Sequence, residues 1–195
     1  MTTVVGVDPS LTATGLCTWR DGRFYVDTIV TPSTMPAAER HHVIVTRVLR
    51  MADPSDVGRA QPRRTVFVVE GLLKPGGDAL RGNSYLELAE LRGVLNYALH
   101  IKGFSRVDVN PMTLKLYATG NGRASKQSML DAARGRLGHL FAVRNDNEAD
   151  AGWLCVMGLH RYGMPLARPA LPAKNLRALN VPTWAPFTLE GDHGD

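Results

Sequence analysis

The pattern of apolar and polar positions along the chain predicts five β-strands. The run at residues 65–70 is nearly all apolar, which is typical of a central strand covered on both faces. Arg20-Asp21-Gly22 carries a hairpin turn signal between two earlier runs. Strands are therefore expected at residues 4–8, 12–19, 23–30, 65–70 and 107–109.

The segments between these runs show the three- and four-residue spacing of helices. Leu88, Leu91, Leu95 and Leu99 recur at this spacing, and Ser125 is placed to cap a later helix. Strands followed by helices in this way predict an α/β fold with a mixed five-stranded sheet flanked by helices. Helices are expected at residues 36–51 and 82–100, in a short segment from 111, after Ser125, and from about 145 to beyond 159.

The amino-acid composition of the chain changes at about residue 163. Residues 1–163 carry all the predicted strands and have the length of one domain. Residues 164–195 are expected to form a Pro-rich C-terminal extension with one short helix at 173–179. Part of this extension is expected to dock on the domain through an apolar strip. The strip consists of Leu176, Leu179, Val181 and Trp184.

Composition narrows the class of protein. The 195 residues are 44% hydrophobic and 21% charged, as in ordinary globular proteins. No apolar run approaches the roughly 18 residues of a membrane span, so no membrane association is expected. Cys17 and Cys155 cannot form a disulfide framework, which favours a reducing, cytoplasmic location.

The chain carries 23 basic and 18 acidic residues, a net charge of +5, and the basic residues are concentrated late in the sequence. Between residues 102 and 144 there are eight basic residues and only two acidic ones. This stretch could be a solvated basic surface, or it could let a polyanion such as nucleic acid approach. Arg161, Arg168, Lys174 and Arg177 follow with no acidic residue between them.

Three carboxylates are the main candidates for chemistry. Asp8 ends the first strand, Glu70 follows the central strand, and Asp150 lies among small residues near the start of the last helix. Each has an ordinary explanation, as a turn residue, a buried salt-bridge partner or a helix cap, respectively. As a set of oxygen ligands without a nearby His or Cys, they favour Mg²⁺ or Mn²⁺. Two such ions about 3.5–4 Å apart are a standard device for phosphodiester hydrolysis.

With these positions the chain resembles the RuvC-type Holliday-junction resolvases, which belong to the ribonuclease H-like nuclease superfamily. The matching pieces occur in the family's order over roughly residues 4–162, and the Gly-x-Gly-x-Ala-x-Lys segment at 120–126 makes the set specific. The pieces are Gly6–Gly15, Val69-Glu70, Leu91–Val94, Pro111 with Lys115, Thr119–Lys126 and Glu148–Ala151.

This resemblance implies a ribonuclease H-like fold, a homodimer, and Mg²⁺-dependent nicking of opposed strands in a four-way DNA junction. Asp8, Glu70 and Asp150 fall on the family's metal-binding acids, which implies two ions per site, with Mn²⁺ able to replace Mg²⁺. Lys115 and Lys126 fall on basic residues near the scissile phosphate. No nucleotide cofactor is expected, and the cytoplasm of a bacterium or of a phage-infected host is the expected location.

Further contacts with DNA are expected from two loops. The loop at 72–83 matches the family segment that reaches into the junction centre, where an apolar wedge is common. Gly120-Asn121-Gly122 could present backbone N–H groups to a phosphate, or it could be a plain connecting turn. The predicted DNA-binding residues are Lys115, Lys126, Arg123, Asn121, Leu72, Leu73 and Lys74.

Asn147 departs from the family pattern, which usually has Asp or His three residues before the last aspartate. At helical spacing both Asn147 and Asp146 share a face with Asp150. Asp146 could therefore supply the fourth metal ligand, or Asn147 could contribute a neutral oxygen. An inactivating substitution would look the same in the sequence.

The sequence as a whole predicts a structure-selective endonuclease on branched double-stranded DNA, with Asp8, Glu70, Asp150 and Lys126 as catalytic residues. One alternative is a nuclease of the same fold acting on other substrates, such as RNA–DNA hybrids or flaps. Another is a junction-binding protein without catalysis. An actin-like ATPase or sugar kinase is less favoured because the chain shows no second phosphate loop.

Overall fold

The computed structural model describes residues 2–52, 64–72 and 83–186, and it contains a five-stranded sheet in the order β3-β2-β1-β4-β5. The first three strands pair antiparallel, whereas β1, β4 and β5 run parallel. The mixed five-stranded sheet predicted from the sequence is thus confirmed. The strands are β1 (Thr3–Asp8), β2 (Ala13–Arg20), β3 (Arg23–Val30), β4 (Thr65–Glu70) and β5 (Ser105–Val109).

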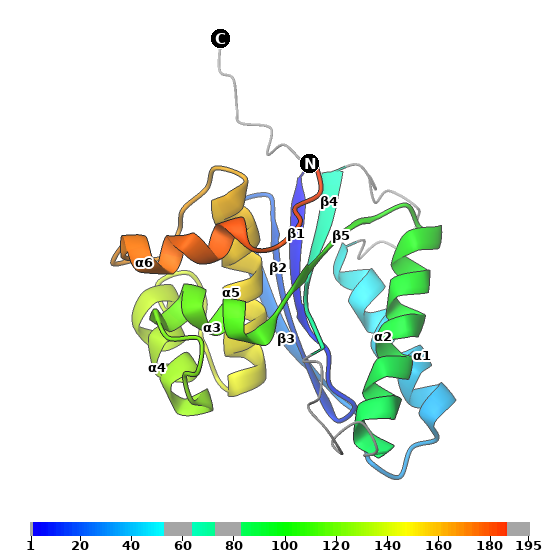
Figure 1. Cartoon of the computed structure of the whole chain (residues 1–195). Helices are drawn as coiled ribbons and strands as arrows, with labels where there is room; N and C mark the ends of the chain where they lie inside the picture. The colour runs from blue at the N-terminus through cyan, green and yellow to red at the C-terminus, as the bar shows by residue number, and fades with distance from the viewer. Residues whose placement is uncertain (1, 53–63, 73–82, 187–195) are drawn as a thin grey trace.

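Helices cover both faces of the sheet, which gives three layers (Figure 1). On one face lie α1 (Ala37–Ala52) and α2 (Asn83–Ile101). The other face is covered by α5 (Asp146–Arg161), with the remaining helices packed outside it. These are α3 (Pro111–Thr119), α4 (Lys126–Leu137), α6 (Ala173–Leu176) and the 3₁₀ helix η3 (Arg177–Asn180).

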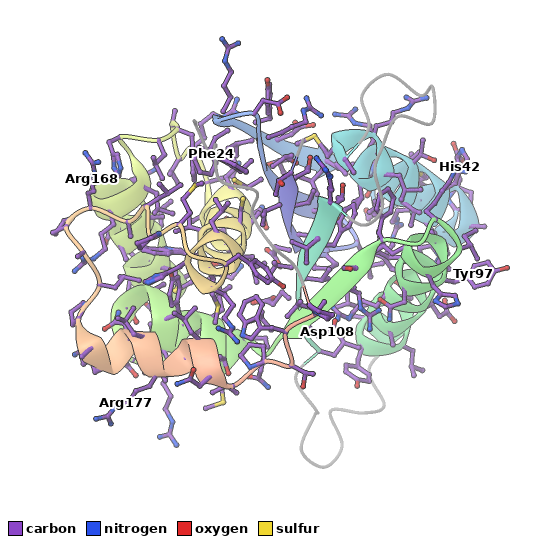
Figure 2. All side chains as sticks on the ribbon, turned by 90° about the horizontal axis from the view of Figure 1, so that it is seen from above. Phe24, His42, Tyr97, Asp108, Arg168 and Arg177 are labelled. Atoms are coloured by element: carbon purple, nitrogen blue, oxygen red, sulfur yellow. The ribbon has the colours of Figure 1, made fainter. Side chains whose placement is uncertain are left out.

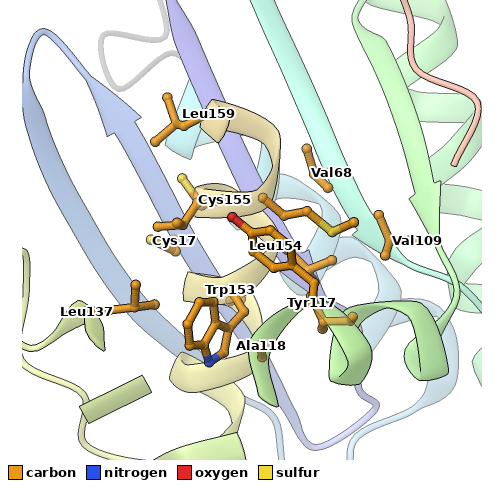
Figure 3. Packing of buried hydrophobic residues seen from close by; sticks show 14 of the residues in the cluster. Cys17, Val68, Val109, Tyr117, Ala118, Leu137, Trp153, Leu154, Cys155 and Leu159 are labelled. Carbon is orange, nitrogen blue, oxygen red and sulfur yellow. The ribbon is translucent and has the colours of Figure 1, made fainter. Parts of the chain in front are cut away.

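Each face of the sheet has its own hydrophobic core because successive strand side chains point to opposite faces. In β4, Phe67 and Val69 join the core under α1 and α2, whereas Val66 and Val68 join the core under α5. Figure 3 shows the second core, in which Leu154 and Cys155 of α5 lie over the sheet. This double burial explains why the β4 sequence is almost continuously apolar.

Two glycines let α5 lie unusually close to the sheet. A Cβ built on Gly6 of β1 would overlap the carbonyl oxygen of Ala151, and a Cβ built on Gly15 of β2 would overlap that of Asn147. Because Gly15 pairs with Asp8, the first turns of α5 lie against the end of β1 that carries Asp8. The two strand glycines therefore make room for α5 next to Asp8.

Side-chain caps fix where the later helices begin. Ser125 caps α4 by accepting from the N–H of Ser128, as predicted. Asn145 caps α5 by accepting from the N–H of Glu148 at 2.9 Å, so the start predicted for this helix is also confirmed. With its own backbone fixed in this way, the first turn of α5 is a rigid support for the residues that follow.

Residues 164–186 pack against the helical layer outside α5. Leu171 and Ala178 are buried, and the predicted contacts of Leu176, Leu179 and Trp184 with the core are present. Val181, by contrast, is 63% exposed. Figure 2 shows Arg168 and Arg177 at the outer side of this region, far from His42 and Tyr97 on the opposite layer. None of the helices in the described ranges is long and apolar enough to cross a membrane.

Candidate functional site

The parallel pairing of β1 and β4 brings Asp8 and Glu70 together. Val7 pairs with Val69, so the next residues, Asp8 and Glu70, stand side by side where the two strands end. Their carboxyl groups lie close enough to interact, since each perturbs the pKa of the other. The parallel register therefore places two acidic residues at one point on the edge of the sheet.

Asp150 reaches the same place from the opposite layer. It lies on the second turn of α5, which the close contact at Gly6 holds against β1. The Oδ1 atom of Asp150 is buried and has no hydrogen-bond partner among the residues that the structure describes. A buried oxygen without a partner costs free energy, which a cation or a donor at this position would recover.

The electrostatics of the three acids confirm that they interact. Burial raises the pKa of Glu70 to about 7, and the charge of Asp150 contributes to the increase. Burial likewise raises the pKa of Asp150 to about 7, with contributions from Asp8 and Asp146. The pKa of Asp8 lies well above its usual value, first because of burial and then because of Glu70. Near neutral pH the cluster therefore holds protons that a metal ion would displace.

The ordinary explanations for these residues find little support. No ion pair involves Asp8, Glu70 or Asp150 within residues 2–52, 64–72 and 83–186. Asp150 does not cap α5, since Asn145 does. Buried carboxylates without an ion-pair partner are typical of functional sites rather than of structural ones.

Two predicted lysines lie beside the acids. Lys115 of α3 lowers the pKa of both Glu70 and Asp150, which partly offsets their increase. Lys126 at the start of α4 forms a 2.9 Å ion pair with Asp146, although its side chain is 82% exposed. This ion pair raises the pKa of Lys126 and lowers that of Asp146. The structure thus brings together acids and lysines from distant parts of the sequence.

The site holds side chains that fit a divalent metal ion but are not yet arranged around one. Among the described residues, no group of three or more His, Cys, Asp or Glu side chains stands as a ready ligand cluster. Asp8 and Glu70 nevertheless interact with each other, whereas Asp146 is paired with Lys126. The donor set consists of oxygens, and the partnerless Oδ1 of Asp150 is a free ligand atom, so these residues fit Mg²⁺ or Mn²⁺.

Asn147 occupies a constrained place. Its backbone carbonyl presses against Gly15 opposite Asp8, which puts the residue next to the cluster as the helical spacing predicted. Asp146 also lies nearby, since its charge raises the pKa of both Asp8 and Asp150. Which of the two residues would complete the ligand set stays a prediction.

Arg92 is a site residue whose role the sequence did not reveal. This arginine of α2 is buried, and its guanidinium donates to the backbone carbonyl of Glu70 and, at 2.8 Å, to Oδ1 of Asp108 on β5. It therefore ties the end of β4 to the next strand. An arginine among the regularly spaced leucines of a buried helix face was the available signal.

Glu148 is a second such residue. Only 2% of its side chain is exposed, and it accepts from the backbone N–H of Arg144 at 2.8 Å while pairing with the Arg144 side chain at 2.9 Å. It thus fixes the loop before α5. The Glu three residues after the Asn145 cap is a capping-box pattern that could have indicated this role.

The predicted DNA-binding residues are only partly placed. Asn121 and Arg123 are exposed on the loop between α3 and α4, where the Asn121 side chain accepts from the N–H of Arg123 at 3.0 Å. Leu72 is half-buried just beyond Glu70. Leu73 and Lys74 lie outside the described residues.

Comparisons with known proteins identify the family. No family model matches the chain. A crossover junction endodeoxyribonuclease RuvC of Anaeromyxobacter sp. (strain K) is 30% identical over 139 residues, which cover 71% of this chain and 69% of that protein. The chain belongs to the RuvC family. The RuvC of Gloeobacter violaceus is 34% identical over 92 residues, a match that covers 47% of this chain and spans about half (53%) of that protein.

Solved RuvC structures agree with this assignment. Thermus thermophilus RuvC has a TM-score of 0.60 and 26% identity over 85% of this chain and 98% of its own. A second structure, of T. thermophilus RuvC in complex with Holliday junction substrate, has a TM-score of 0.59 and 24% identity, covering 80% of this chain and 91% of its own. The ribonuclease H-like α/β fold implied by the resemblance is thus confirmed.

Proposed function

We propose that this protein is a structure-selective endonuclease that nicks four-way and related branched DNA junctions with the help of divalent metal ions. The observation that carries the proposal is the convergence of Asp8, Glu70 and Asp150, with a buried oxygen that has no partner. Its RuvC relatives are named crossover junction endodeoxyribonucleases, and one relative has been solved with a Holliday junction. The names of the relatives support the proposed substrate, and the acid cluster supports the proposed chemistry.

The three carboxylates, with Asp146 or Asn147, would hold two Mg²⁺ ions, which Mn²⁺ could replace. When bound, such a pair supplies the activation of water and the charge stabilisation that phosphodiester hydrolysis needs. The chain's own contribution is to hold oxygen ligands on two rigid strand ends and one close-packed helix. Arg92 acts indirectly in this arrangement, by fixing the backbone of Glu70.

Lys115 and Lys126 would bind the phosphate next to the acids. Both act electrostatically on the carboxylates, so both lie where a phosphate would need positive charge. Lys126 now pairs with Asp146 and would turn from that carboxylate to the phosphate when DNA binds. Asn121, Arg123 and Leu72 would contact the DNA from the surrounding loops, together with Leu73 and Lys74 outside the described residues.

A homodimer would present two such sites to the near-symmetric arms of a junction. The outer face of α2 supports this part of the proposal, because it exposes large apolar side chains at helical spacing. Tyr97 is 67% exposed and Ile101 60%. Substituting Tyr97 by Glu would then shift the protein from dimer to monomer in analytical ultracentrifugation, and an unchanged sedimentation coefficient would place the interface elsewhere. The exposed apolar residues of this face are Leu86, Val94, Tyr97 and Ile101.

The direct test is incubation of the protein with an end-labelled synthetic four-way junction in MgCl₂. Wild-type protein should nick two opposed strands, and Glu70→Gln should lose at least about 100-fold in rate while still binding the junction. Glu39→Gln is the matched control, since Glu39 is an exposed glutamate on α1. Retained nicking by Glu70→Gln would contradict the proposed site. Tight junction binding by wild type without nicking in Mg²⁺ or Mn²⁺ would instead indicate a binding protein, and preferred cleavage of RNA–DNA hybrids would change the substrate.

A further inference from the structure

The segment formed by α6 and η3 is anchored to the end of α3, close to the loop that leads to Lys126. Asn175 is buried, and its Nδ2 donates to the backbone carbonyl of Tyr117 at 2.8 Å. Gly120 ends α3 with a φ of +77°, a conformation that favours glycine. The neighbouring Lys174 lies directly over this glycine, since a Cβ built on Gly120 would come within 2.5 Å of Cε and 2.9 Å of Nζ. The exposed Lys174 side chain therefore lies next to the end of α3.

The charge around Gly120 is positive and unbalanced. Arg123, Lys174 and Arg177 are exposed, and none of them forms an ion pair with the residues that the structure describes. Figure 2 shows Arg177 projecting from the outer side of this segment. The sequence from 151 to 189 contains no Asp or Glu at all. We call these three residues the Gly120 patch.

A structural role explains only part of this patch. A lysine at the C-terminal end of a helix interacts favourably with the last carbonyls, which would account for Lys174 at the end of α3. It would not account for Arg123 or Arg177, whose side chains donate no hydrogen bond to those carbonyls within the described part of the chain. Three exposed cations within a few residues of Gly120 or Lys174, none with an ion-pair partner among the described residues, indicate an anionic partner instead.

The Gly120 patch continues the positive side of the candidate active site. Lys115, which acts on Glu70 and Asp150, precedes Gly120 by five residues of α3, or about 7.5 Å of helix. One strand of duplex DNA carries a phosphate about every 3.4 Å along its axis. A strand held at Lys115 would therefore present its next phosphates to the patch.

We propose that Lys174, Arg123 and Arg177 bind the sugar–phosphate backbone of a DNA arm outside the active site. The inference rests on the proposed function for the placement of the DNA, and it gives the C-terminal segment a part in holding the substrate. Contacts of this kind add affinity and orientation without reading the base sequence. They also make binding depend more steeply on salt.

The test is the affinity for a fluorescent four-way junction, measured in EDTA over a range of KCl concentrations. Lys174→Ala and Arg177→Ala should each make the plot of log association constant against log[KCl] less steep by about 0.9. If the wild-type and variant plots meet at 1 M KCl, this change is about an 8-fold loss of affinity at 0.1 M. Lys174→Arg should keep the slope. Arg23→Ala is the matched control, because Arg23 is exposed at the opposite end of the sheet from Asp8.

Three outcomes would overturn the inference. The first is an unchanged salt slope in both alanine variants. If the wild-type protein still nicks the junction, the proposed function is unaffected by this result. A lower melting temperature of Lys174→Ala with an unchanged slope would show that the lysine only caps α3. If wild type bound no junction, the proposed function would fail. The Gly120 patch would then be tested by measuring the salt dependence of binding to a plain DNA duplex. A slope that does not change in Lys174→Ala and Arg177→Ala would overturn the inference.

Discussion

Replacing Glu70 by Gln should stabilise the metal-free protein above neutral pH, although the same change should abolish its activity. The Glu70 carboxyl has an ordinary pKa of 4.5, and burial beside Asp150 raises it to about 7 in the folded state. Between these values the folded protein binds more protons than the unfolded chain. The free energy of unfolding therefore falls as the pH rises from about 4.5 to about 7, and the loss is complete at higher pH.

The size of this effect follows from the pKa difference. One pKa unit corresponds to about 1.4 kcal/mol, so an increase from 4.5 to about 7 corresponds to a destabilisation of about 3 kcal/mol at pH 8. A neutral glutamine avoids this cost and can still donate a hydrogen bond to Asp8. For a domain of this size, about 3 kcal/mol corresponds to a rise of about 6–12 °C in melting temperature.

Calorimetric melting in EDTA at pH 5 and pH 8 measures the effect. Glu70→Gln should melt at nearly the wild-type temperature at pH 5 and well above it at pH 8. The exposed Glu39→Gln should show no such dependence on pH. A Glu70→Gln protein that melts at or below the wild-type temperature at pH 8 would refute the account of a repulsive, buried acid cluster.

Three further substitutions test the parts around the acids. Gly15→Ala should lower the free energy of unfolding, measured in urea, by about 3 kcal/mol, because its Cβ would overlap the Asn147 carbonyl. The control Gly135→Ala on α4 meets nothing within 4 Å and should raise this free energy by about 0.5–1 kcal/mol. Similar effects of the two substitutions would contradict the close packing of α5. Arg92→Lys should lower the nicking rate about 10- to 100-fold at unchanged junction affinity, because it loosens the backbone of Glu70, and an unchanged rate would remove Arg92 from the site. Asn147→Asp should raise the Mg²⁺-dependent nicking rate or leave it unchanged, and a marked loss would show that Asn147 is not at the metal.

Much of the fold could be predicted because its sequence signals are local. The continuous apolar run of β4 indicated burial on both faces, and β4 is paired on both sides, between β1 and β5. The Asn-rich start of α5 and the Ser125 cap of α4 placed two helix ends correctly. Such patterns depend on a few neighbouring residues, so they can be recognised without the tertiary structure.

The arrangement of the site could be predicted only in part. Asp8 and Glu70 both end buried strands, but their contact depends on the parallel register of β1 and β4. The position of Asp150 depends on Gly6 and Gly15, whose importance is visible only once α5 lies against them. The position of Arg92 on the leucine face of α2 indicated burial, but its role depends on partners from strands distant in the sequence, the backbone carbonyl of Glu70 and the side chain of Asp108.

The central claim is that Asp8, Glu70 and Asp150 hold divalent metal ions together. A crystal soaked in MnCl₂, with data collected near the manganese absorption edge, tests it most directly. The account predicts anomalous density within about 2.0–2.3 Å of carboxylate oxygens from all three residues, and its loss in Asp150→Asn crystals treated in the same way. Manganese bound elsewhere, or at only one of the three carboxylates, would contradict the account.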